Sequence, residues 1–238
     1  AQDFIVRLPD TGGAVYHFRH VITSDTIYGS ILRQQRSEIH GQVAQAIESF
    51  FYNRLEEQVE ALATHYARSS FQDRALYYLA RAGNKAARAF ANAEALAYYE
   101  QALDLLGRVG STIQQQLDVL VGMGDVLVFV GEYELARKRY QQAMIALQRR
   151  AGLADAHRMG SLERRIAGTC TKQGDYDQAL IYLAAALRQV QAGSGPAARE
   201  EMARICEDPG WVYLRRGLLD QARSWLQRGL ELVDEARN

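Results

Sequence analysis

The chain has 238 residues, with 28 lysines and arginines against 28 aspartates and glutamates, so its formal net charge at pH 7 is zero. This balance argues against nucleic acid or a membrane surface as the main partner, because both select basic proteins. Hydrophobic residues make up 48% of the chain, enough for the core of one or two domains. The 2 cysteines form no CxxC motif, so neither a disulfide framework nor a zinc site is indicated.

Residues 1–20 differ from the rest of the chain. Two short β-prone runs, FIVRL at 4–8 and AVYHF at 14–18, flank the turn-forming PDTGG at 9–13, so we expect a β-hairpin. No signal peptide is evident, because the first residues lack a basic region followed by an apolar one. We therefore expect a cytoplasmic setting. The absence of an initiator methionine also suggests an excerpt from a longer protein.

Residues 21–110 predict an irregular helical junction with degenerate repeats. Apolar residues recur there at helical spacing, but without a constant repeat length. A helix beginning near Thr26 would be capped by Ser24 or Asp25. The next helix, about 34–51, should bury one face, and the following helices, about 56–68 and from 74 on, should do the same. The predicted faces are Ile39, Val43, Ala46, Ile47 and Phe50; Val59, Leu62, Ala63 and Tyr66; Ala75, Leu79 and Ala82; and Ala95, Tyr99 and Ala102.

Residues 111–238 repeat one pattern three times. The hexapeptides GEYELA, GDYDQA and GLLDQA begin at Gly131, Gly174 and Gly217, and each ends in an alanine, so the pattern recurs every 43 residues. A small residue precedes each turn on one helix, and a large apolar residue follows on the next. Antiparallel helices approach closely where one side chain is nearly absent, so we expect three helix pairs that stack into a continuous core. The small and large residues are Gly124, Ala167 and Gly210, and Tyr140, Leu183 and Leu226; the alanines are Ala136, Ala179 and Ala222.

This pattern resembles the tetratricopeptide repeat, most closely in GWVYLRRGLLDQA at 210–222. The period is longer than the ~34 residues usual in that family, and its closing proline is absent. The resemblance implies an all-α fold: a tetratricopeptide-like α-solenoid, a right-handed superhelix of helix pairs, with the short β-hairpin at its N-terminus.

The segments at 16–48 and 61–103, with their FRH and LARAG…NAEAL sequences, resemble the junction found in bacterial signal-transduction ATPases with numerous domains (STAND type). They are most similar to those attached to class III adenylate/guanylate cyclases. The resemblance implies that residues 1–20 are the remnant of a winged-helix module, and that an ATPase or cyclase module belongs to the same full-length chain. It also implies that His20 senses nucleotide in the full-length protein only. The alternative is that His20 merely hydrogen-bonds the hairpin.

We find no motif for catalysis. The chain contains no GxxxxGK[ST] phosphate-binding loop, no HExxH zinc motif and no GxSxG nucleophile motif. Adjacent acidic pairs stand at expected helix starts, where the helix dipole favours negative charge. We therefore predict that the chain is not an enzyme and holds no cofactor and no metal.

The remaining candidate is a binding surface on the concave face of the solenoid, formed by the first helix of each pair. A groove that is basic and aromatic at one end suits a protein or peptide partner with carboxylates and an apolar anchor. The predicted partner-binding residues are Asp118, Asp125, Phe129, Arg164, Lys172, Arg204, Trp211 and Arg215.

Two alternatives remain open at this point. One is a small-molecule-sensing pocket at the helical junction, with Tyr77, Tyr78, Tyr98 and Tyr99 as its best residues. The other is homodimerisation through the last helix, which carries Leu226, Leu230 and Val233.

Overall fold

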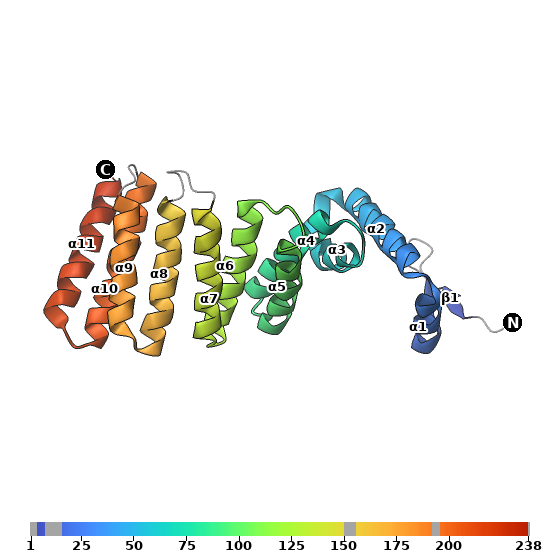
Figure 1. Ribbon diagram of the computed structural model, residues 1–238, viewed down its shortest axis with the longest axis horizontal. Coiled ribbons are helices and arrows are strands. Elements are labelled where there is room, and N and C mark those ends of the chain that lie inside the picture. The colour runs from blue at the N-terminus through green and yellow to red at the C-terminus, as the bar shows by residue number, and fades with distance from the viewer. Residues whose placement is uncertain (1–3, 8–15, 150–155, 192–195, 238) are drawn as a thin grey trace. The chain divides into compact units, whose positions relative to one another are not determined.

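The computed structural model describes residues 4–7, 16–149, 156–191 and 196–237. The described chain is a tetratricopeptide-like helical solenoid with a two-stranded hairpin near its N-terminus (Figure 1), as the sequence predicts. It divides into two compact units, residues 1–78 and 79–238, which we describe separately. None of the helices in the described ranges is both long enough and apolar enough to cross a membrane.

The first unit opens with the predicted hairpin. Strand β1 (Ile5–Arg7) pairs antiparallel with β2 (Tyr16–Phe18), and Val6 lies opposite His17. The described side chains of β2 are exposed to solvent. The predicted PDTGG turn lies outside the described residues.

Helix α1 (Val21–Ser30) begins before the predicted start near Thr26. The carbonyl of His20 already accepts hydrogen bonds from the amides of Thr23 and Ser24, so the helix starts directly after the second strand. The predicted cap by Ser24 or Asp25 is therefore wrong, since both residues lie within the helix. No residue of α1 is buried.

Helix α2 (Arg33–Phe50) buries a different face from the predicted one. His40, Gly41 and Ala44 are buried, whereas Phe50 is 83% exposed. Gly41 explains the rotation, because a Cβ there would lie only 2.7 Å from the ring of Phe71. The helix therefore contacts the rest of the unit through its smallest residue, while Val43 and Ile47 are half-buried and Ile39 and Phe50 are exposed. Sequence periodicity counts apolar residues and does not detect a face chosen by a glycine.

The remaining part of the first unit follows the prediction more closely. A 3₁₀ segment, η1 (Tyr52–Gln58), leads into α3 (Val59–Ala67), where the predicted set of four residues is buried. The hydroxyls of Tyr66 and Tyr78 both donate to the carboxylate of Glu48, at 2.6 and 2.5 Å, and their rings stack with centroids 5.4 Å apart. Arg74 donates to the same carboxylate at 2.9 Å. This cluster ties α2, α3 and the start of α4 together.

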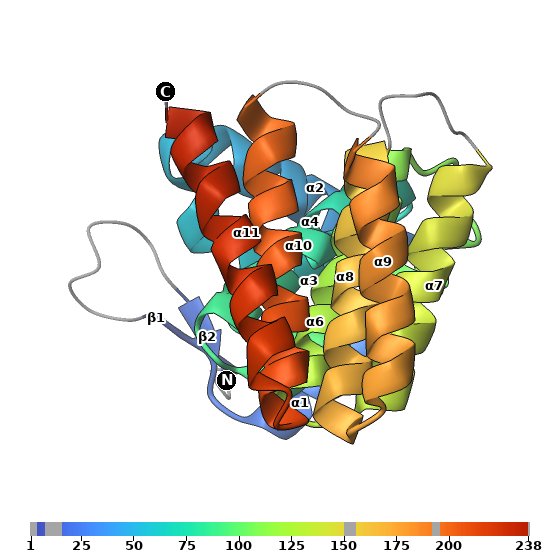
Figure 2. The ribbon, with the colours of Figure 1, turned by 90° about the vertical axis from the view of Figure 1, so that its left-hand side faces the viewer.

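The second unit is a row of antiparallel helix pairs (Figures 1 and 2), in which each second helix packs against the first helix of the next pair. Residues 107–112 connect the first of these pairs to the second, and Thr112 forms a capping box with Gln115 at the start of the next helix. The helices are α4 (Gln72–Arg88), α5 (Asn92–Leu106), α6 (Ile113–Phe129), α7 (Tyr133–Gln148), α8 (Ala156–Gln173), α9 (Tyr176–Gln191), α10 (Pro196–Arg215) and α11 (Leu219–Arg237).

The small residues act as the sequence predicts. Ala136 and Ala179 are fully buried, and Ala222 is 3% exposed. A Cβ at Gly210 would lie 2.6 Å from Cγ of Leu226, and one at Gly124 would overlap the Tyr140 ring. The close approach of each helix pair therefore depends on the absence of a side chain on the first helix. Burial between pairs makes the core continuous along the unit.

The turn glycines permit a backbone conformation that other residues adopt at a penalty. Gly174 has φ 82°, in the left-handed region, and no atom within 4 Å of an added Cβ. We expect Gly174→Ala to destabilise the protein by about 1–2 kcal/mol through backbone strain alone. Gly168 in α8 is the matched control, because an added Cβ there has no atom within 4 Å and its φ is not positive. Gly168→Ala should stabilise by up to about 1 kcal/mol. Urea unfolding of both variants tests the difference, and equal effects would contradict it.

The α4–α5 pair precedes the three regular pairs. It repeats their contacts at a spacing of 41 residues from the α6–α7 pair. A Cβ at Gly83 would lie 2.7 Å from the ring of Tyr99, as Gly124 meets Tyr140. Tyr99 donates to Asn84 at 2.7 Å, and Tyr140 donates to Asp125 at the same distance. The predicted faces of the two helices are buried, Ala75, Leu79 and Ala82 on α4 and Ala95, Tyr99 and Ala102 on α5.

Polar contacts between successive pairs also repeat. Gln173 donates to Glu134 at 2.9 Å, and 43 residues later Arg216 donates to Asp177 at 2.8 Å. In both cases the end of a first helix contacts the start of the preceding second helix. These contacts fix how each pair sits on the one before it.

Candidate functional site

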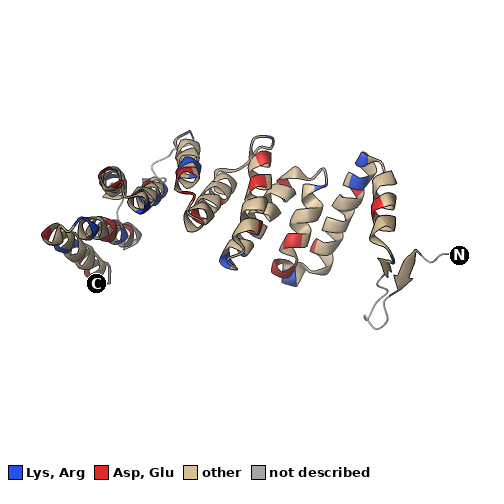
Figure 3. Cartoon of the chain, turned by 90° about the horizontal axis from the view of Figure 1, so that it is seen from below, with Lys and Arg blue, Asp and Glu red and all other residues tan. Residues whose placement is uncertain are grey.

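The eight predicted partner-binding residues lie on α6, α8 and α10, the first helices of three successive pairs. We call their exposed side the first-helix face. The residues fall into register: Phe129, Lys172 and Arg215 are equivalent positions of the 43-residue repeat, and Asp125 is equivalent to Trp211. Figure 3 colours the charged residues of the chain: the two in α6 are both acidic, whereas α8 and α10 carry residues of both signs.

Two of the predicted basic residues are bound to acidic residues of α10. Arg164 approaches Asp208 at 3.3 Å and Glu201 at 3.6 Å, and Arg204 approaches Glu201 at 3.7 Å. Glu201 is only 5% exposed. Burial raises the pKa of the Asp208 carboxyl, and the neighbouring Arg164 guanidinium opposes that rise. Arg164 and Arg204 therefore compensate buried or half-buried carboxylates.

Asp125 is also compensated within the protein. Its carboxylate accepts hydrogen bonds from Tyr140 at 2.7 Å and from Arg165 at 3.1 and 3.3 Å, so it joins α6, α7 and α8. Burial and the Asp125 carboxylate raise the pKa of the Tyr140 hydroxyl, which stays protonated and donates. Asp118 is exposed and accepts from Gln114 at 2.7 Å.

The other four predicted residues are exposed. Phe129 is 65% exposed and Trp211 is 51% exposed, although the indole nitrogen of Trp211 donates to Glu207 at 3.3 Å. Within the described residues, Lys172 and Arg215 are exposed and make no ion pair or hydrogen bond. The first-helix face thus offers two aromatic side chains and two uncompensated cations.

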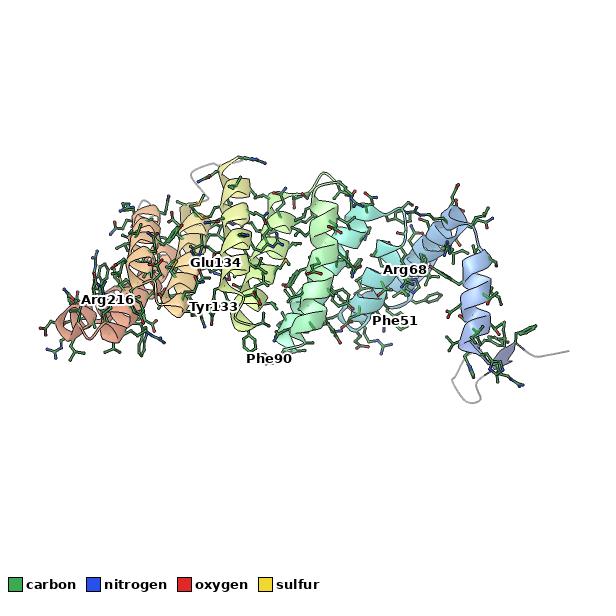
Figure 4. All side chains as sticks on the ribbon, turned by 60° about the horizontal axis from the view of Figure 1, so that its bottom comes forward. Phe51, Arg68, Phe90, Tyr133, Glu134 and Arg216 are labelled. Atoms are coloured by element: carbon green, nitrogen blue, oxygen red, sulfur yellow. The ribbon has the colours of Figure 1, made fainter. Side chains whose placement is uncertain are left out.

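A cavity of about 500 Å³ lies between α4, α5 and α6 of the second unit. Tyr99, whose pKa burial raises to about 12, is among its lining residues. Phe129 is also among them, together with Phe90, which was not predicted from the sequence. Phe90 has φ 59° and is 72% exposed, and it projects from the end of the helices (Figure 4). The 41-residue spacing from Gly131 was the signal that could have identified it.

The first unit contains a histidine pair that the sequence spacing did not indicate. Nδ1 of His40 lies 2.9 Å from Nδ1 of His65, and Nε2 of His40 lies 2.9 Å from the hydroxyl of Tyr28. These residues come from α1, α2 and α3, so their approach depends on tertiary packing. Burial lowers the pKa of both imidazoles, and the Arg68 guanidinium lowers both further.

The histidine pair predicts a dependence of stability on pH. Because the folded-state pKa values lie below the ordinary value of 6.5, the unfolded chain binds protons more readily. The contribution of the histidine pair to the free energy of unfolding should be fully present above pH 6.5. It should be lost as the pH falls through the folded-state pKa values. Urea midpoints measured across this range test the prediction. The double variant His40→Gln/His65→Gln should lose most of the pH dependence, and an unchanged slope would contradict the assignment.

The residues of the other predicted sites are less distinctive. His20 is exposed at the N-terminus of α1 and its side chain makes no capping hydrogen bond. Tyr78 and Tyr99 are buried and fill the cores of their own units, whereas Tyr77 is 44% exposed. Among the described residues, no group of three or more histidine, cysteine, aspartate or glutamate side chains is arranged to hold a metal ion.

Comparison with known proteins supports the fold. The family model of the tetratricopeptide repeat matches residues 158–235. An uncharacterised protein of Rhizobium meliloti (strain 1021), R02095, is 30% identical over 152 residues. That alignment covers 62% of this chain but only 15% of the Rhizobium protein, so the chain spans a small part of its relative.

Solved structures show the same fold at low sequence identity. BtubC from P. vanneervenii is 15% identical with a TM-score of 0.63, covering 88% of this chain and 94% of that one. YrrB, a tetratricopeptide protein with an unusual peptide-binding site, is 18% identical with a TM-score of 0.56, covering 88% and 91%. A Rap protein complexed with the Competence and Sporulation Factor is 15% identical with a TM-score of 0.56, covering 92% and 66%.

Proposed function

We propose that this chain is a non-catalytic interaction arm. It binds a protein or peptide along the first-helix face, which forms the concave side of the solenoid. The observation that carries the proposal is that α6, α8 and α10 each have one buried side and one exposed side. Their small and apolar residues are buried between helix pairs, while Phe129, Trp211, Lys172 and Arg215 remain exposed on one face. Aromatic side chains and cations on rigid helices suit recognition of an extended segment.

The comparisons are consistent with this function. YrrB has a peptide-binding site, and the Rap protein was solved with a bound factor, so the fold serves such recognition in other proteins. We take from these proteins only the type of ligand. The residues proposed for binding come from this chain.

A selection from a library of short random peptides displayed on phage tests the proposal. Peptides enriched on the immobilised protein should lose binding to the double variant Lys172→Glu/Arg215→Glu. Arg223→Glu on α11 is the matched control, because Arg223 is exposed on a second helix. Arg164 is unsuitable for charge reversal, since it compensates Glu201 and Asp208. The proposal fails if no peptide is enriched, or if both charge variants bind equally.

We further propose that the chain is a sensor arm of a longer, cytoplasmic signalling protein with an ATPase or cyclase module. Support comes from the resemblance of residues 16–48 and 61–103 to STAND-type junctions, and from a relative that is several times longer than the aligned part. In this proposal residues 1–20 complete a winged-helix module, residues 21–110 form the junction and residues 111–238 form the arm. Nucleotide hydrolysis by the full-length protein should respond to a selected peptide, and His20→Ala should alter that response. A full-length sequence without a nucleotide-binding module would refute it.

Homodimerisation through α11 is a second candidate, favoured by one observation. Leu230 is 66% exposed and Leu219 is 61% exposed on this helix, while Leu226 packs against Gly210. Light scattering after size exclusion should show dimers that Leu230→Lys converts to monomers. A monomer at every concentration would exclude this candidate.

A further inference from the structure

Two phenylalanines occupy positions where the repeats carry other residues. The turn within each regular pair holds a glycine with positive φ: Gly131, Gly174 and Gly217, at 89°, 82° and 74°. The same position in the α4–α5 pair holds Phe90, also with positive φ, at 59°. This conformation is unfavourable for a residue with a Cβ. The aromatic ring is therefore kept where glycine would be easier to accommodate.

The second departure occurs in the last turn of the first helices. Arg88, Lys172 and Arg215 are equivalent positions in α4, α8 and α10, where a cation favours the negative end of the helix dipole. The equivalent position in α6 is Phe129. An exposed ring replaces a charge that would suit the helix end.

The two departures meet in space. The rings of Phe90 and Phe129 lie with centroids 5.8 Å apart and planes inclined by 43°, and both rings are mostly exposed. Both line the cavity of about 500 Å³, together with Tyr99 and Val126. We name this cavity the Phe90–Phe129 pocket. Neither ring is buried by the fold, and one is held in an unfavourable backbone conformation, which points to a role outside folding.

We propose that the Phe90–Phe129 pocket receives a bulky apolar side chain of an extended acidic peptide, whose carboxylates bind Lys172 and Arg215. The inference rests on the proposed function and specifies its ligand. It assigns the anchor to the end of the first-helix face nearest α4, and it assigns the charge recognition to the next two pairs.

Charge complementarity selects an acidic ligand. The carboxylates that face inward between these helices are compensated, since Asp125 accepts from Arg165, and Asp208 and Glu201 lie against Arg164. Among the described residues, Lys172 and Arg215 have no partner. Asp118 and Glu207 are exposed on the same helices and accept hydrogen bonds from the neutral side chains of Gln114 and Trp211. Lys172 and Arg215 nevertheless offer positive charge to a ligand that passes along α8 and α10, and complementary charges guide and orient a partner.

The repeat geometry predicts the spacing within the ligand. Phe129, Lys172 and Arg215 are equivalent positions on three consecutive first helices. Neighbouring packed helices lie about 10 Å apart, and an extended chain advances about 3.3 Å per residue. Successive contacts should therefore be separated by about three ligand residues, which gives an apolar residue followed or preceded by acids about three and six positions away.

The test uses the same 238-residue chain and phage-displayed peptides, with dissociation constants then measured by fluorescence polarisation. Phe90→Gly and Phe129→Lys restore the residue types that the repeat carries elsewhere, so they should keep or raise the thermal midpoint. Each should weaken binding of a selected peptide by at least about tenfold, as expected for an anchor pocket. Ile181→Lys on α9 is the control, because Ile181 is 57% exposed on a second helix, and it should bind like the original protein.

The outcomes separate the inference from the proposed function. Selected peptides should share an apolar residue with acids at the predicted spacing, and replacing that apolar residue by serine should reproduce the loss seen with Phe129→Lys. The inference is overturned if Lys172→Glu/Arg215→Glu abolishes binding while both phenylalanine variants bind normally, although the proposed function then stands. Failure of every peptide overturns both. If no acidic peptide is enriched and a labelled single-stranded oligonucleotide binds the protein, the ligand is nucleic acid and the inference is refuted.

Discussion

Replacing Tyr140 by alanine should lower the free energy of unfolding by about 3–5 kcal/mol, the range for large buried aromatic residues. Tyr140 is 1% exposed and its ring fills the space left by Gly124, where an added Cβ would overlap it. The substitution leaves a cavity at the crossing of α6 and α7 and removes a donor to Asp125. Equilibrium urea unfolding followed by circular dichroism measures the loss.

Tyr140→Phe is the matched control for this prediction. It keeps the packed ring and removes only the hydroxyl, and Arg165 remains to compensate Asp125. We expect a loss of about 1 kcal/mol, as for a single hydrogen bond. If the two variants were equally destabilised, the hydrogen bond would dominate over packing. If neither were destabilised, the helix crossing would not depend on the pair formed by Gly124 and Tyr140.

Replacing Glu48 by alanine should have the second-largest effect, a loss of about 2–4 kcal/mol, because it leaves two buried hydroxyls without their acceptor. Tyr66 and Tyr78 are 1% and 2% exposed, and both donate to this carboxylate. Burial raises the pKa of both hydroxyls, and their hydrogen bonds to Glu48 raise it further. Near-ultraviolet circular dichroism should also report the disturbed tyrosine stack.

Glu48→Gln provides the comparison, because the amide keeps one acceptor oxygen. It should cost about 1 kcal/mol, less than half of the alanine effect. If Glu48→Ala lowered the free energy of unfolding by less than about 1 kcal/mol, water would replace the carboxylate without penalty. The first unit would then depend on apolar packing alone.

The regular repeats were predictable because their close packing depends on single small residues at fixed positions. Ala136 and Ala179 are fully buried, and Gly131 and Gly174 adopt positive φ, since a closely packed helix pair tolerates few alternatives at these positions. The hairpin and the buried face of α3 followed from composition and periodicity in the same way. The domain boundaries remain a prediction.

The failures share a different cause. The face of α2 was wrong because Gly41 meets Phe71, a residue far along the chain. His40 and His65 meet for the same reason, and the link between Arg164 and Glu201 depends on how two helix pairs stack. Periodicity within one element carries no information on such contacts. The candidate face was predicted from register, but the compensation of Arg164 depends on contacts between helices α8 and α10.

The most direct test of the account is an NMR titration of the isotopically labelled chain with a selected acidic peptide. We predict that backbone amide shifts change around Phe129, Lys172 and Arg215, along one face of α6, α8 and α10. Changes confined to α7, α9 and α11 would contradict the proposal that the first-helix face is the binding surface.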